Sequence, residues 1–268
     1  MARVDAAPRA RRIGVVNWRG LWTLYVREVK RFLKVFMQTV AAPVVTTLLF
    51  LAIFLLAMGG QQRSVHEVPF LEFLAPGLIM MAMVQNAFAN TTSSLMIAKF
   101  QGSIVDLLMP PLSPIELTLG LALGGVTRGL VVGVVVAAAM AVVVPIHIVS
   151  PALAIFHAVA ASLLLSVLGI IGAIWADKFD HIAAVTNFVV TPLSFLSGTF
   201  YSIHQLPHTW QIVALFNPFF YMIDGFRYAF IGRADASILA GVVIMSALDA
   251  ALLLLCHVLI ARGWKLKA

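Results

Sequence analysis

Long apolar runs dominate the chain, and their lengths predict its fold. Uncharged stretches cover residues 35–58, 73–98, 148–176 and 182–223, and two further apolar blocks at 117–146 and 236–261 each contain one charged residue, Arg128 or Asp249. Each block can cross the hydrocarbon layer of about 30 Å as a helix. Alternating ten-residue segments typical of a membrane β-barrel do not occur. The pattern predicts an all-α polytopic membrane protein with six transmembrane helices.

The block at 182–223 is too long for one crossing and scarcely long enough for two. Both ends of the chain are basic, which predicts that both termini are cytoplasmic and that the number of crossings is even. We therefore predict one crossing at about 182–201. The following segment, about 202–234, mixes Pro, His, Gln and Asn with aromatic residues, a composition typical of membrane interfaces. It is predicted to form re-entrant or interfacial helices on the external side.

Composition supports this class of protein. Hydrophobic residues make up 62% of the 268 positions and charged residues only 11%, against about 45–50% and 25% in soluble domains. The net charge of +7 comes largely from the termini, since nine of the 18 Lys and Arg residues lie in the first 34 positions and three in the last seven. The basicity therefore indicates topology, with no nucleic-acid partner. The single cysteine, Cys256, excludes an internal disulfide and a thiolate metal site.

The first 34 residues are predicted to form a basic cytoplasmic tail followed by an amphipathic helix. Apolar side chains, including Trp18 and Trp22, recur there at helical spacing, and basic residues such as Arg27 and Arg31 fall largely elsewhere. The helix could anchor the chain to anionic lipid, contact a cytoplasmic partner, or do both. A 24-residue apolar run that starts only after this segment does not resemble a cleavable signal peptide.

A short helix is predicted at about 103–109, in the cytoplasmic loop after the second crossing. Ser103 and Asp106 have the spacing of a capping box, and Pro110–Pro111 must end the helix. The apolar residues expected to be exposed there, where they would have neither lipid nor core to cover them, are Ile104, Leu107 and Leu108. This short helix could be a docking surface for another protein, or it could be only a well-capped turn.

The third crossing carries its own signals. Ser113, Pro114 and Glu116 supply an N-cap, an N1 proline and an N3 acid. Small residues at every fourth position let helices approach closely, and such a series is formed by Gly125, Gly129 and Gly133. This series indicates either ordinary helix packing or an interface that moves.

Arg128 and Asp249 are charges within the third and sixth crossings. Both lie about 12 residues from the cytoplasmic end, or roughly 18 Å. Charges at this depth cost several kcal/mol unless paired or hydrated. They could form an ion pair between the two crossings. Alternatively each is solvated separately, with Arg128 snorkelling or facing a water-filled cavity and Asp249 protonated or bonded to backbone.

No G-x-x-x-x-G-K-[ST] motif occurs, so the chain has no P-loop for nucleotide phosphates, and any ATP chemistry must come from another chain. Several motifs together resemble the membrane permease of type-2 ABC exporters, and most closely the bacterial nodulation-factor and polysaccharide-exporter branch. They are Leu74–Met80, Ala98–Gln101 followed by the helix ending at Pro110–Pro111, Val126–Gly129 and Asn217–Arg227. The resemblance covers about residues 17–265.

The resemblance implies a transport subunit without enzyme activity, located in the bacterial inner membrane. It implies a homodimer with two copies of a separate ATPase that carries the ATP and Mg²⁺, and an amphiphilic substrate such as a lipid-linked glycan, a lipid or a drug. By position, residues 17–34 match the connecting helix and 103–109 the coupling helix that docks on the ATPase, within a transmembrane domain at 35–262 followed by a basic tail at 263–268.

The segment before the last crossing is expected to form an external lid on the dimer; the alternative is a passive interfacial loop. Its candidate gate residues are Tyr201, Asn217, Pro218, Tyr221, Asp224 and Arg227. A different class of function, an ion-coupled secondary transporter using Arg128 and Asp249, is suggested by intramembrane ionisable groups. Such transporters usually show internal repeats, and the two halves of this chain show no self-similarity.

Overall fold

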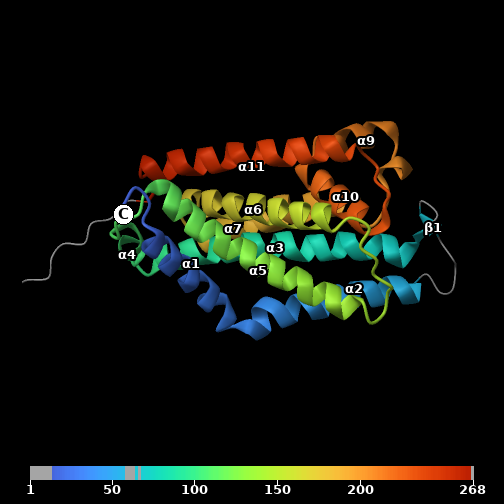
Figure 1. Ribbon diagram of the computed structural model, residues 1–268, viewed down its shortest axis with the longest axis horizontal. Helices are drawn as coiled ribbons and strands as arrows, with labels where there is room; N and C mark the ends of the chain where they lie inside the picture. Colours follow the sequence, from blue (N-terminus) through green and yellow to red (C-terminus); the bar gives the residue numbers. More distant parts are fainter. Residues whose placement is uncertain (1–13, 58–63, 66–67, 267–268) are drawn as a thin grey trace, which may run out of the picture.

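The computed structural model describes residues 14–57, 64–65 and 68–266, and the outermost parts of both predicted basic tails lie outside the described residues (Figure 1). The elements in chain order are α1 (Trp18–Leu33), the π-helical turn η1 (Met37–Ala41), α2 (Ala42–Ala57), β1 (Ser64–Val65), β2 (Val68–Pro69), α3 (Phe70–Phe100), α4 (Ile104–Leu108), α5 (Pro114–Met140), α6 (Pro151–Trp175), α7 (Phe179–Val185), the π-helical turn η2 (Thr186–Val190), α8 (Thr191–Leu196), the 3₁₀ turn η3 (Ile203–Gln205), α9 (His208–Leu215), α10 (Pro218–Ile231) and α11 (Ile238–Ala261).

Among the described residues, six helical stretches are long and apolar enough to cross a membrane. They are Met37–Leu56, Phe70–Phe100, Pro114–Met140, Pro151–Trp175, Phe179–Leu196 and Ile238–Ala261. The prediction of an all-α membrane protein with six crossings, including a single crossing in the long fifth block, is confirmed. The small antiparallel pair β1–β2, in which Ser64 pairs with Pro69 and Val65 with Val68, is not predicted by the apolar pattern.

Helix α3 is the centre of the bundle. In its most apolar window 83% of residues are buried, against 22% for Met37–Leu56, 11% for Phe179–Leu196 and 17% for α11. Glycines on its neighbours make this possible: a Cβ added at Gly129 of α5 would lie 3.1 Å from the Met83 carbonyl, and one at Gly169 of α6 would lie 2.8 Å from the Phe88 carbonyl. The glycine series of α5 therefore lies in close helix contacts.

The start of α5 has the cap that its sequence predicts. Ser113 Oγ accepts the Glu116 N–H at 3.4 Å, and the Glu116 carboxylate accepts the N–H groups of Ser113 and Asn17, each at 2.6 Å. Because Asn17 is the N-cap of α1, this one carboxylate fastens the starts of two helices together. The second predicted capping box, at Ser103, is wrong: α4 begins there without a side-chain cap bond, and Ser103 has φ −82° and ψ 7° instead of the extended conformation of a capping residue.

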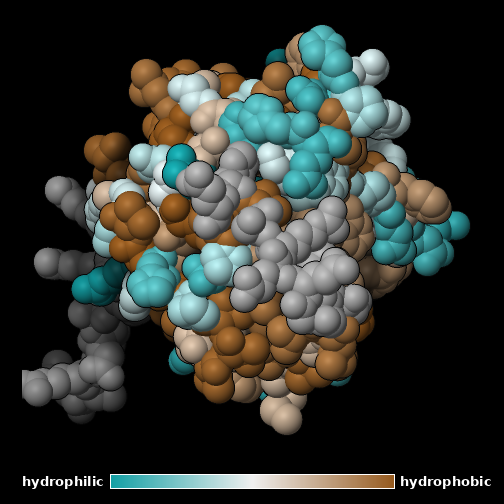
Figure 2. Space-filling view, turned by 90° about the vertical axis from the view of Figure 1, so that its right-hand side faces the viewer, coloured by the Kyte–Doolittle hydropathy of each residue, from teal (hydrophilic) through white to brown (hydrophobic). Residues whose placement is uncertain are grey.

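The two ends of the bundle differ. The start of α1, helix α4 and the C-terminus lie at one end, called here the α4 end, and the β pair, α9 and α10 lie at the other, called the α9 end (Figure 1). Figure 2 looks onto the α9 end. Hydrophilic residues gather at its upper right, and hydrophobic residues cover most of its lower part. Helix α10 turns back into the bundle, with ten of its 14 residues buried.

Candidate functional site

A polar stripe on α3 lies between α2 on one side and α7–α8 on the other. Gln85 and Asn86 line two cavities, one of about 290 Å³ against α2 and one of about 430 Å³ against α7, η2 and α8. Other polar residues around these cavities contribute amide and hydroxyl groups: Gln38, Thr46, Thr47, Thr92, Ser93, Thr186 and Thr191. Among the described lining residues there is no acid or base. The arrangement is a neutral, hydrogen-bonding groove at the face of the bundle.

Aromatic rings meet where this groove approaches the α9 end. The ring of Phe200, just after α8, stacks on Phe54 of α2 at 5.4 Å and lies 6.3 Å from Phe50 and 5.4 Å from Phe195. Phe54 in turn lies 6.0 Å from Phe70 at the start of α3. The cluster joins α2 to the end of α8, so it narrows the groove at this end. Sequence analysis did not single out these phenylalanines, because nothing in an apolar run distinguishes lining rings from lipid-facing ones.

Arg128 contacts the same stripe from α5. Its Nη2 donates to Asn86 Oδ1 at 2.8 Å, and Asn86 Nδ2 donates to the Ala82 carbonyl at 2.9 Å. The ion pair with Asp249, one of the two alternatives, is not formed: Arg128 makes no ion pair with any described residue, and Asp249 Oδ1 has no hydrogen-bond partner among them. The two side chains are therefore held separately, Arg128 by an amide of α3.

An ion pair within α1, Glu28 with Arg31, is hydrogen-bonded to α3 one turn further along the stripe. Glu28, fully buried, lies 3.1 Å from Arg31 and accepts from Ser94 Oγ at 2.8 Å. Arg31 also donates to Ser93 Oγ at 3.0 Å and to the carbonyl and side-chain oxygens of Asn90 at 2.6 and 3.0 Å. The amphipathic pattern of α1 did not predict this network, because charged residues on an amphipathic helix are expected to face solvent.

Helix α1 turns one face to the bundle and its two tryptophans away from it. Leu24, Glu28 and Phe32 face the bundle, whereas Trp18 and Trp22 are exposed. An added Cβ at Gly124 of α5 would meet Glu28, so the α5 glycines outside the predicted series also make room for α1. The exposed tryptophans remain available for lipid or for a partner.

Helix α4 turns only part of its apolar surface outward. Ile104 and Leu107 are 5% and 4% exposed and belong to a core at the α4 end that includes Leu24 of α1, so the prediction that they are exposed is wrong. Leu108 is exposed as predicted, together with Val105 and with Met109, which is 75% exposed. The reason is the helical period: residues three apart share a face, and this face meets the core. Asp106 lies on the first turn of the helix.

The predicted gate residues at the α9 end act as structural ties. The Asp224 carboxylate accepts the N–H groups of Asp235 and Ala236 at 2.8 and 3.0 Å, just before α11. Arg227 is buried, and its guanidinium donates to the carbonyls of Phe73, Gly198 and Thr199.

The remaining predicted gate residues support α10 and the segment before it. Asn217 caps α10 and donates to the Leu193 carbonyl at 2.9 Å, with Pro218 as the first helical residue. The Tyr201 hydroxyl donates to the Leu196 carbonyl at 3.1 Å, and the Tyr221 ring packs edge-on against Phe220. Five of the six residues belong to α10 or its N-cap, and Tyr201 is bonded to the end of α8.

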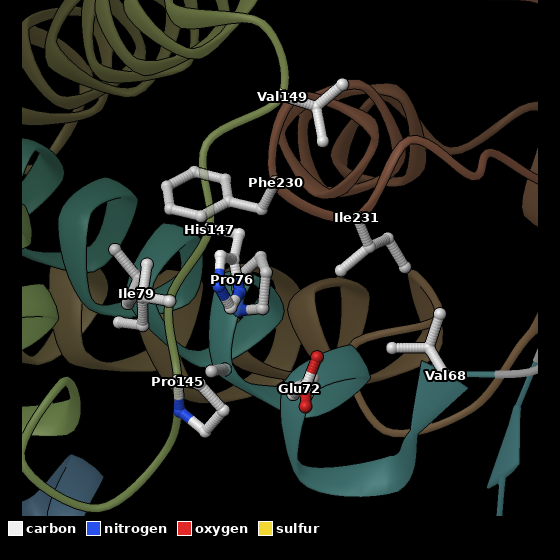
Figure 3. A pocket seen from close by; sticks show the side chains of 11 residues that line it. Val68, Glu72, Pro76, Ile79, Pro145, His147, Val149, Phe230 and Ile231 are labelled. Carbon is white, nitrogen blue, oxygen red and sulfur yellow. The ribbon is translucent and has the colours of Figure 1, made fainter.

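A further pocket of about 200 Å³ opens at the α9 end, between the start of α3, residues 145–149 and the end of α10. Figure 3 shows the Glu72 carboxylate and the His147 ring as its polar groups among apolar side chains such as Pro76, Phe230 and Ile231. It is separate from the groove over Gln85 and Asn86.

Comparison with known proteins decides the family. The ABC-2 type transporter family model matches residues 19–231, from the amphipathic helix to the end of α10. The chain belongs to the ABC-2 type transporter family. This permease is therefore the transmembrane subunit of an ABC transporter and a transport component, in a family whose members normally work with an ATPase subunit.

Two relatives place the permease more closely. It is 37% identical over 251 residues to the inner membrane transport permease YadH of Escherichia coli (strain K12), an alignment that covers 94% of this chain and 98% of the relative. It is 24% identical over 227 residues to nodulation protein J of Rhizobium leguminosarum bv. viciae, covering 84% and 86% of the two chains. The permease is a multi-pass inner membrane protein, and the predicted family resemblance is confirmed.

Proposed function

We propose that the permease is the membrane half of an ATP-driven exporter that moves an amphiphilic substrate through the groove between α2 and α7–α8. The observation that carries the proposal is α4, a short helix whose inner residues are packed into the bundle while Val105, Leu108 and Met109 point outward. A short helix that is anchored in the bundle and exposes apolar side chains can bind another protein and transmit its movement to the bundle. ATP and Mg²⁺ belong to that protein, the ATPase subunit, of which two copies are proposed.

The fastening of α1 supports this role. Glu116 joins the starts of α1 and α5, and the Glu28–Arg31 pair joins α1 to α3. A movement of α4 is therefore transmitted to a unit of three connected helices, of which α3 lines the groove. Both described ends of the chain lie at the α4 end, which agrees with the proposal that this end and both termini are cytoplasmic.

The test changes residues on the exposed face of α4 and leaves the buried residues that anchor the helix unchanged. Val105→Asp with Met109→Asp should abolish the stimulation of a co-expressed ATPase while the permease still inserts and purifies as a folded protein. The matched control is Val142→Asp, which also places an acid at an exposed valine but at the α9 end of α5. ATPase coupling that persists in the first variant would sink the docking role.

We further propose that two copies pair across the groove. Phe188 in η2 and Leu49 in α2 are exposed on the two helices that flank the polar stripe. The hydroxyls of the groove donate largely to carbonyls of their own helices, as Thr46, Thr92 and Thr186 do. A groove facing acyl chains alone would still offer no hydrogen-bond partner to the amides of Gln38 and Gln85, and a second copy would enclose it. In a background with Cys256→Ala, a bifunctional thiol reagent should cross-link the Leu49→Cys, Phe188→Cys protein as dimers. Val134→Cys, exposed on α5, should give none.

The ion-coupled alternative rested on Arg128 and Asp249. Family membership favours an ABC permease instead, and the two residues do not form the charge pair that would have linked them.

A further inference from the structure

Arg128 is a half-buried cation that makes no ion pair with any described residue. The other cations within the bundle are satisfied: Arg31 pairs with Glu28, Arg227 donates to three carbonyls, and Lys99 donates to three carbonyls at the end of α6. Arg128 has one neutral partner, the amide of Asn86. An arginine carries five hydrogen-bond donors and keeps its charge in proteins. Because one neutral amide satisfies neither the donors nor the charge, binding of an anion at this site is favoured.

Hydrogen-bond donors outnumber acceptors on this seam between α3 and α5. Arg128 Nε is buried and has no hydrogen-bond partner among the described residues, and the same holds for Asn90 Nδ2, one turn along α3. Asn90 Oδ1 is already used by Arg31, which fixes the orientation of the amide. Buried donors without acceptors cost free energy. The partner missing from this seam is a hydrogen-bond acceptor that itself carries negative charge.

The seam communicates with the groove through Asn86. This residue holds Arg128 and also lines both cavities. Because the other polar groups around the cavities are amides and hydroxyls, no described lining residue would repel an anion.

Helix α1 borders the site on the side of α5. Tyr25 of this amphipathic helix bonds to Thr127, the neighbour of Arg128, at 3.0 Å, and Glu28 packs against Gly124, one turn before it. Arg128 itself lies near the middle of α5, 14 residues after its start at the α4 end, at the depth that α1 reaches in the bundle.

We infer that Arg128, positioned by Asn86, binds the phosphate group of an amphiphile that enters the groove. The guanidinium fork matches phosphate oxygens with two parallel hydrogen bonds, and the apolar part of the ligand would lie against Phe88, Met96 and Ile182 of the larger cavity. The inference rests on the proposed function, whose substrate class it narrows to phosphate-bearing amphiphiles.

The test measures ligand binding to the full-length permease in detergent, without any ATPase, so that failed coupling and failed binding are distinguished. The probes are dioleoyl phosphatidic acid, dioleoylglycerol as its phosphate-free match, and inorganic phosphate. Wild type should bind the phosphatidic acid about tenfold more tightly than the glycerol, as expected for charge-assisted hydrogen bonds. Competition by inorganic phosphate would identify a site for the free anion, and lack of competition a site for the lipid-borne group.

Two variants abolish the uncompensated positive charge in different ways. Arg128→Gln deletes the cation, whereas Asn86→Asp keeps it and supplies an internal carboxylate at hydrogen-bond distance, which should preserve or raise the unfolding temperature. Both should reduce the preference for the phosphate-bearing ligand to less than about twofold, and Arg262→Gln, an exposed arginine at the α4 end, should leave it unchanged. A folded Asn86→Asp protein with the wild-type preference would overturn the inference.

Discussion

Gly225 of α10 packs directly onto the imidazole ring of His157 in α6. The ring is fully buried, and its Nδ1 donates to the Leu153 carbonyl at 2.9 Å, so it has little freedom to move. A Cβ added at Gly225 would overlap the ring. The glycine is thus what lets α10 lie inside the bundle.

Gly225→Ala should therefore displace α10 and lower stability by about 1–3 kcal/mol, the usual cost of overpacking. Thermal unfolding in detergent measures it. Gly241→Ala is the matched control, because a Cβ there would lie 3.8 Å from Tyr221 and 3.9 Å from His157, which are ordinary contacts. If His157→Ala restores the stability of the Gly225→Ala protein, the overlap is the cause; equal losses in both glycine variants would contradict this account.

Arg227→Lys should destabilise the α9 end although it keeps the charge. The guanidinium reaches carbonyls on two separate segments, Phe73 of α3 and Gly198–Thr199 after α8, and stacks 3.8 Å above the Phe73 ring. An ammonium cannot reproduce this geometry, so we expect a loss of about 2–4 kcal/mol. Unfolding temperature and hydrogen exchange of α10 report it. The exposed Arg19→Lys should change neither; a similar loss there would point to a general effect of the substitution.

Glu28→Ala should loosen α1 from the bundle. It leaves the half-buried Arg31 without its counter-ion and removes the hydrogen bond to Ser94, a change expected to cost about 1–3 kcal/mol. Hydrogen exchange should rise along α1 and ATPase stimulation should fall. Arg27 also lies 3.9 Å from Glu28 but is half-exposed, so Arg27→Ala should cost less than about 1 kcal/mol. Equal protection of α1 in wild type and the Glu28→Ala protein would show that the pair is dispensable.

Two lysines bind carbonyls at the end of α6, and they should contribute differently to the stability of the protein. Lys99 donates to the carbonyls of Ala173, Ile174 and Ala176, while Lys265 donates to the Trp175 carbonyl and to Asp177 at the surface. Lys99→Met should cost about 1–3 kcal/mol and Lys265→Met little. Thermal unfolding compares them, and a larger loss for Lys265→Met would reverse the assignment.

The contact of Asp177 also predicts a pH dependence. The hydrogen bond from Lys265 lowers the pKa of the Asp177 carboxyl. A lowered pKa in the folded state means that the contact is present at neutral pH and is lost as the pH falls through that value. Digestion of the C-terminal turn by a carboxypeptidase active in acid should therefore accelerate at low pH, and Asp177→Asn should make it fast at every pH. Digestion independent of pH in wild type would contradict the anchor.

The sequence by itself determined the class of the fold, because the length and apolarity of a membrane crossing can be read directly from the chain. Six crossings, the single crossing in the block at 182–223 and the cap at Ser113 and Glu116 all followed from local patterns. The family motifs likewise indicated the transport class.

Only the tertiary structure decided which face of each helix is buried. In a chain this apolar, lipid-facing and core-facing positions carry the same residue types, so Ile104 and Leu107 were assigned to the surface although they lie in the core. The same limit hid the burial of Glu28, since a charged residue on an amphipathic helix normally faces water. It also left open whether Arg128 pairs with Asp249 or is held separately. The contact with Asn86 that decides this depends on how α5 is rotated against α3, which the packing of the whole bundle sets.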